Sequence, residues 1–155
     1  MRVCYLIHPE HSEVLAYFPT EEFDNKGNKM SYQHIGQHGA CSVEYAKECR
    51  DATPDEYEAL HKELTTMVGY EGLVIKSIND PLRVLRVCAK CVDMFNGILL
   101  VDGKKVKSHD GYVPDFMPGE HYGDYVEMDI DLDTGEILNW IVPDQKDVLE
   151  QLNGE

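Results

Sequence analysis

The chain has 155 residues, of which 43% are hydrophobic and 28% charged, and its formal net charge is -15. This length suits one domain, residues 1–155, with a core of its own, and no apolar run approaches the roughly 20 residues of a membrane-spanning helix. The negative charge argues against direct nucleic-acid binding, because a phosphate backbone would be repelled.

The start of the chain and its cysteines bear on the cellular compartment. The apolar run at 3–7 ends at His8 and Pro9, which is too short for the core of a secretory signal. The five cysteines are odd in number and lie mostly in apolar patterns, as is typical of reduced thiols. A cytoplasmic protein is therefore predicted, and nothing in the sequence calls for a cofactor.

The first half of the chain predicts strands and two helices. The apolar runs at 3–7, 14–18 and 30–35 are typical of strands, and Ser42 is a candidate cap for a short helix from about 43 to 50. Thr53-Pro54-Asp55-Glu56 is a capping box with proline at the first helical position. Apolar residues at helical spacing follow until Gly69, and a buried strand is expected over 73–78.

The second half predicts a helix, two hairpins and a final helix. Asp80 and Pro81 precede an apolar stripe at helical spacing, so a helix is expected from 82 until Asn96 and Gly97. Strands at 98–101 and 104–107 flank Asp102-Gly103, which suits a type I′ turn. Alternation over 126–133 predicts a strand with one buried face, which turns at 133–135 and pairs with 136–142 before a helix over 144–152.

Together these elements predict an α+β fold. About seven strands are expected in a mostly antiparallel or mixed sheet, with three to four helices packed on it.

His34, His38 and Cys41 form an unusual polar cluster with two glycines between them. On a straight strand, His34 and His38 would share a face about 13 Å apart and Cys41 would face away. A bend at Gly36 or Gly39 would instead place His38 beside Cys41 at the start of a helix, where the pKa of a thiol is lowered. Ordinary structural or loop residues are the favoured interpretation, and a hydrolase-like Cys/His site or a metal site is the alternative.

Cys88 and Cys91 have the spacing of a zinc or redox pair. No second pair of cysteines at this spacing exists, and the predicted helix places both residues far from its N-terminus, so packing is the favoured interpretation. A metal-binding domain that combines them with a histidine is the third alternative, and no metal ligand is assigned.

The segment from 108 to 123 has no regular period, and structureless loops of this length are usually functional or disordered. It mixes aromatic and polar side chains, which is typical of binding surfaces. The alternative is that Phe116 and Met117 cover a sheet edge. The predicted binding residues in this loop are His109, Asp110, Tyr112, Phe116, His121 and Tyr122.

Glu127, Asp129 and Asp131 project from one face of the predicted late strand, and something must offset their mutual repulsion. Lys105 and Lys107 on a neighbouring strand would neutralise this face. If the face is exposed instead, its negative field would attract a basic protein partner. The sequence therefore predicts a protein-interaction module, which would act as an inhibitor or accessory factor. One form of such an inhibitor is a decoy that mimics nucleic acid. The alternative is the Cys/His enzyme.

Overall fold

The computed structural model describes residues 1–34, 36–93, 98–101, 104–107 and 123–153, with the strands between 87 and 107 given as backbone. The chain divides into two compact units, Met1–Pro81 and Leu82–Glu155, which we call unit 1 and unit 2. The α+β class predicted from the sequence is confirmed, with strands in two sheets. That the whole chain behaves as one domain stays a prediction.

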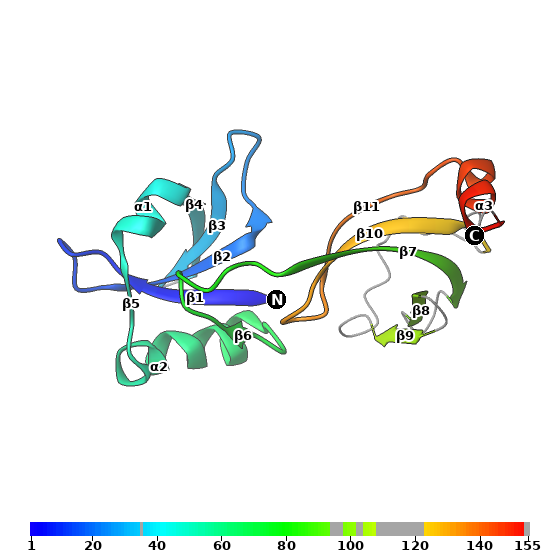
Figure 1. The fold of residues 1–155 in the computed structure, drawn as a ribbon. Coiled ribbons are helices and arrows are strands. Elements are labelled where there is room, and N and C mark those ends of the chain that lie inside the picture. Colours follow the sequence, from blue (N-terminus) through cyan, green and yellow to red (C-terminus); the bar gives the residue numbers. More distant parts are fainter. Residues whose placement is uncertain (35, 94–97, 102–103, 108–122, 154–155) are drawn as a thin grey trace. The chain divides into compact units, whose positions relative to one another are not determined.

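Unit 1 is built on a mixed sheet whose strand order is β4-β3-β2-β1-β5, with β6 pairing in parallel with β1 (Figure 1). The central strand β1 is buried along its whole length, and the predicted strands at 3–7, 14–18 and 30–35 correspond to the first three. The strands are β1 (Arg2–Ile7), β2 (Val14–Glu22), β3 (Lys29–Gln33), β4 (Gln37–Cys41), β5 (Arg50–Asp51) and β6 (Val74–Ile75).

The helices of unit 1 begin where the sequence places their caps. Helix α1 (Val43–Glu48) starts with Ser42, whose Oγ accepts a hydrogen bond from the Tyr45 amide at 3.1 Å. Helix α2 (Pro54–Glu63) starts with the predicted capping box, in which the Glu56 carboxylate accepts from the Thr53 amide at 2.8 Å. A π-helical turn (Leu64–Val68) extends α2 to Gly69, whose φ of 85° ends the helix.

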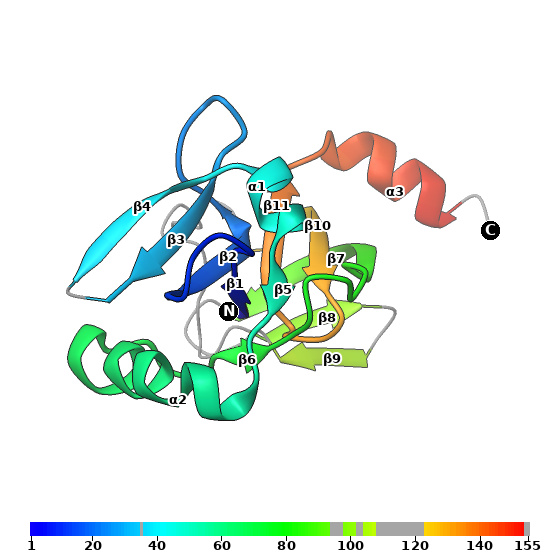
Figure 2. The same cartoon turned by 90° about the vertical axis from the view of Figure 1, so that its left-hand side faces the viewer.

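The two helices pack against opposite faces of this sheet. On one face, Tyr5 and Phe18 form a core with Leu60 of α2. On the other face, Leu6 and Tyr17 pack with Ala46 of α1. The short α1 covers only part of its face, because the hairpin of β3 and β4 extends beyond it (Figure 2).

Unit 2 is an antiparallel sheet with the order β11-β10-β7-β8-β9, followed by α3 (Gln145–Asn153). The predicted hairpins at 98–107 and 126–142 are confirmed, while the turn at 102–103 lies outside the described residues. Trp140 lies opposite Met128 in the second hairpin. The strands are β7 (Val84–Asp93), β8 (Ile98–Val101), β9 (Lys104–Lys107), β10 (Tyr125–Asp131) and β11 (Ile137–Ile141).

The helix predicted from residue 82 is wrong, because this segment is the strand β7. Its register pairs Leu85 with Ile130 and Val87 with Met128 along the buried face of β10. The same apolar residues fit a helical period and a strand period, and three valines within β7 favour the strand. Backbone pairing with β10 decides in favour of the strand period over the helical period.

Among the described residues, none of the helices has both the length and the apolar character required to cross a membrane.

Candidate functional site

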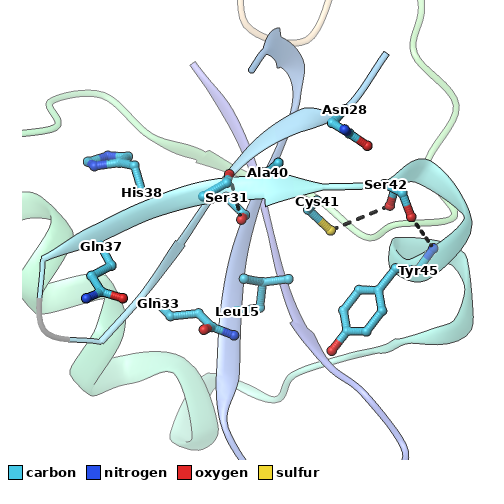
Figure 3. Close-up of a pocket in the computed structure, with 11 residues that line it drawn as sticks. Leu15, Asn28, Ser31, Gln33, Gln37, His38, Ala40, Cys41, Ser42 and Tyr45 are labelled. Atoms are coloured by element: carbon cyan, nitrogen blue, oxygen red, sulfur yellow. Dashed lines mark hydrogen bonds between the residues drawn. The ribbon is translucent and has the colours of Figure 1, made fainter. Parts of the chain in front are cut away.

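A hollow of about 520 Å³ lies on the α1 face of unit 1, over the β3–β4 hairpin (Figure 3). Its floor forms where Ser31 lies opposite Gly39 and Gln33 lies opposite Gln37. Gly39 has no side chain to fill the space, and Ser31 Oγ donates a hydrogen bond to its carbonyl at 3.0 Å. The hollow therefore results from the hairpin register together with the short reach of α1.

Apolar and aromatic groups close the other side of the hollow. Leu15 of β2 is 6% exposed and forms an apolar wall. Tyr45 of α1 lines one end, and its ring stacks on His8 with centroids 4.7 Å apart and planes 8° apart. Because this stack and the α1 cap both hold Tyr45, its ring is a fixed contact surface.

The described lining includes one imidazole, His38, whose ring lies on the other side of β4 (Figure 3), and is otherwise without charge, although the chain carries 43 Asp, Glu, Lys and Arg residues. Among the described residues, eleven line the hollow, and none of them is Asp, Glu, Lys or Arg. The side chains of Asn28, Ser31, Gln33 and Gln37 instead offer amide and hydroxyl groups that both donate and accept hydrogen bonds. Such a lining suits a neutral polar ligand, and the polypeptide backbone is one.

Strand β4 forms an open edge beside this hollow. Within the described part of the chain it pairs with β3 alone, and four of its five residues are exposed or half-buried. Proteins usually protect such edges with charged residues, proline or very short strands. The sequence of β4, Gln-His-Gly-Ala-Cys, has neither charge nor proline, whereas β5 and β6 are two residues long.

No protein-family model, curated protein or solved structure matches the chain.

The opposite side of β4 carries a hydrogen-bonded aromatic cluster. His38 Nε2 lies 2.8 Å from the Tyr70 hydroxyl, and its ring meets Tyr32 edge to face with centroids 4.9 Å apart. Tyr32 Oη donates to the Glu63 carboxylate at 2.6 Å, and His34 Nδ1 lies 2.5 Å from the same carboxylate. This hydrogen bond to Glu63 raises the pKa of Tyr32.

The predicted Cys/His arrangement does not form, because His38 and Cys41 lie on opposite sides of β4 (Figure 3). His38 contacts Tyr70 and His34 contacts Glu63. Cys41 is 5% exposed, and burial raises the pKa of its thiol to about 11, the opposite of the shift that an activated nucleophile needs. The bend expected at Gly36 is an ordinary hairpin turn, and Gly39 stays in a straight strand.

On β10, Asp129 is paired within unit 2 and Asp131 is buried, so of the two alternatives for this acidic face the structure favours neutralisation over exposure. Asp129 accepts two hydrogen bonds from Arg86 at 2.7 and 2.8 Å, and these lower its pKa. Asp131 is fully buried, where its Oδ1 accepts from the Asp133 amide at 2.9 Å. Glu127 is half-buried on the same strand.

The neutralising residues also differ from the predicted ones. Lys105 and Lys107 belong to β9, which pairs with β8 and lies three strands from β10. The arginines come from the segment predicted as a helix: Arg86 binds Asp129, and Arg83 forms an ion pair with Asp133. Because this segment was predicted as a helix, its arginines were not recognised as partners of the acidic strand.

The other predicted binding residues, His109, Asp110, Tyr112, Phe116, His121 and Tyr122, lie outside the described residues, so the aromatic loop stays a prediction. The described residues contain no group of three or more His, Cys, Asp or Glu side chains that could hold a metal ion.

Sequence reasoning missed Ser31, Gln33, Gln37 and Tyr45. Gln33 and Gln37 flank a turn with Gly36 at a φ of 74°, and this hairpin signal would have found their shared face.

Proposed function

We propose that the protein is a protein-interaction module that binds an extended polypeptide segment along the β4 edge of unit 1. The observation that carries the proposal is an edge strand that, among the described residues, pairs with β3 alone, beside a hydrogen-bonding hollow whose described lining has no Asp, Glu, Lys or Arg. A segment added to a sheet edge pairs its backbone with the edge strand, and pockets beside the edge receive alternate side chains. Both features meet at β4.

The chemistry of the lining supports a peptide over a charged small molecule. A phosphate or carboxylate ligand would need a positive group, and the described lining contains no lysine or arginine. Its one imidazole, His38, contacts the Tyr70 hydroxyl on the other side of β4. Amides of Gln33 and Gln37 can bond a peptide group or a neutral side chain in either direction. The fixed ring of Tyr45 adds the aromatic contact area that is frequent at interfaces.

A peptide selection tests the proposal directly. Random peptides of about ten residues, the upper length of a typical strand, are displayed and selected on the purified full chain. Enriched peptides are then synthesised and titrated into isotope-labelled protein. We expect amide chemical-shift changes at 37–41 and at Ser31 and Tyr45, and no enrichment, or shifts confined to unit 2, would refute the proposal.

The matching variant is Gly39→Phe, which fills the hollow. A Cβ at Gly39 would meet nothing closer than Ser31 Oγ at 3.8 Å, and its φ is not in the left-handed region, so the fold should accept the change. We expect peptide binding to weaken about tenfold or more, which equals about 1.4 kcal/mol. The control is Glu58→Phe, which adds the same ring at an exposed position of α2. Equal effects of the two variants would place binding elsewhere.

A further inference from the structure

We infer that the segment bound by β4 alternates neutral polar residues with lysine or arginine, and that its basic side chains lie over His38 and Tyr70. This inference rests on the proposed function. An added strand must present its side chains alternately to the two faces of the sheet. The two faces beside β4 differ in chemistry, so the side chains of the partner segment must alternate in chemistry from one residue to the next.

The face that carries His38 offers the His38 ring and the half-buried Tyr70 ring to a cation, with Tyr32, 1% exposed, packed beneath them. His38 is exposed, and its contacts with the Tyr70 hydroxyl and the Tyr32 ring hold the cluster together. Lysine and arginine bind over aromatic faces within about 6 Å of the ring centroid. The long apolar stems of these side chains can also cover the half-buried Tyr70.

Carboxylates flank the same cluster and favour a positive ligand. Glu63 accepts hydrogen bonds from both Tyr32 and His34 at its margin. Glu21 lies close enough that its charge, after burial, contributes to the raised pKa of Tyr70. Unit 1 as a whole has fourteen Asp and Glu residues against seven Lys and Arg residues. A basic segment is therefore attracted to unit 1 and then held over these rings.

The residues of the bound segment that face the hollow, between the basic ones, should be neutral and polar. A lysine or arginine placed there would lose hydration without meeting a carboxylate, since the described lining has none. Threonine, serine, asparagine or glutamine can pair with Gln33, Gln37 and Ser31. The segment is thus predicted to be basic on one side only.

Four synthetic peptides of about ten residues separate these requirements. The first alternates Thr with Lys, and the second and third replace every Lys by norleucine or by Glu. The fourth has the composition of the first, with all Thr residues before all Lys residues. We expect the alternating Thr/Lys peptide to bind the full chain at least about fivefold more tightly than each of the others, which equals about 1 kcal/mol.

Matched variants of the protein locate the preference. His38→Ala should reduce the advantage of Lys over norleucine to less than about twofold, while the norleucine peptide keeps its affinity. Glu21→Gln should weaken the Thr/Lys peptide alone. Glu58→Gln, which changes the net charge equally at an exposed site on α2, should leave its binding unchanged.

The outcomes distinguish this inference from the proposed function. Equal binding of the Lys and norleucine peptides at β4, or equal binding of the alternating and block peptides, would overturn the basic preference while leaving strand addition in place. Failure of every alternating peptide, together with an unproductive display selection, would overturn both.

Discussion

The β3–β4 hairpin of unit 1 and the β10–β11 hairpin of unit 2 differ in how well the charge of the sequence predicts the charge of the surface. The late hairpin belongs to the most acidic part of the chain, yet Arg86 and Arg83 pair with its carboxylates and Asp131 is buried. The early hairpin has few charges, and its strand β4 is an edge among the described strands, with a hollow beside it. An acidic segment is therefore a poor guide to the surface that contacts a partner, because neighbouring strands can neutralise it.

The largest expected effect tests whether the two units are separate. Phe18 is fully buried in the core of unit 1, so Phe18→Ala should reduce the free energy of unfolding of unit 1 by about 3–5 kcal/mol. Hydrogen exchange measured by NMR should show faster exchange throughout β1–β3 and little change in β10. An equal loss of protection in β10 would instead support the single domain predicted from length.

The second prediction concerns reactivity beside the hollow. Burial raises the pKa of Cys41 from 9.0 to about 11, so its thiolate fraction at neutral pH should be about a hundredfold below that of an ordinary thiol. A thiol-reactive probe at pH 6 and pH 8, with labelled sites identified by mass spectrometry, should modify Cys41 slowly at both. Rapid labelling of Cys41 at pH 6, ahead of every other cysteine, would restore the enzyme interpretation.

The third prediction tests neutralisation in unit 2. Arg86→Gln removes the positive charge that pairs with the Asp129 carboxylate, so binding of oligolysine at low salt should tighten about two- to fivefold. The gain should disappear as salt rises, since exposed charges are screened within about 10 Å at 0.1 M. Lys146→Gln changes the net charge equally on α3 and serves as the control. Equal gains from both variants would show that only net charge matters.

The smallest effect concerns the start of α2. The Arg50 guanidinium, together with the Thr53 amide, lowers the pKa of Glu56 from 4.5 to about 2. A lowered pKa stabilises the folded state above pH 4.5, and this contribution is lost as the pH falls toward 2. Wild type should therefore exceed Glu56→Gln in stability at pH 6, and chemical denaturation should find this difference shrinking below pH 4.5. A difference independent of pH would contradict the assignment.

Local signals predicted much of the fold. Ser42, the Thr53–Glu56 box and Gly69 each act within a few residues of the helix end that they define, so the sequence alone locates both helices of unit 1. The hairpins at 98–107 and 126–142 were found for the same reason. The strand β7 was missed because its conformation depends on β10, about 40 residues away in the chain, and its apolar residues fit either period.

The candidate site was harder to predict than the fold. Sequence reasoning chose His34, His38 and Cys41 as chemically reactive types, but which face of β4 each residue occupies depends on the pairing with β3. Gln33 and Gln37 carry no chemical signal of their own, and they matter only because this pairing places them across from each other. A hollow lined by neutral side chains is a property of the register and of the length of α1.

The position of Trp140 gives each unit a spectroscopic signature. It is the only tryptophan of the chain and lies on β11, whereas six of the nine tyrosines belong to unit 1. Indole fluorescence excited at the red edge of its absorption will therefore follow unit 2, and near-ultraviolet tyrosine signals will follow mainly unit 1. One unlabelled sample can thus yield a separate melting curve for each half of the polypeptide.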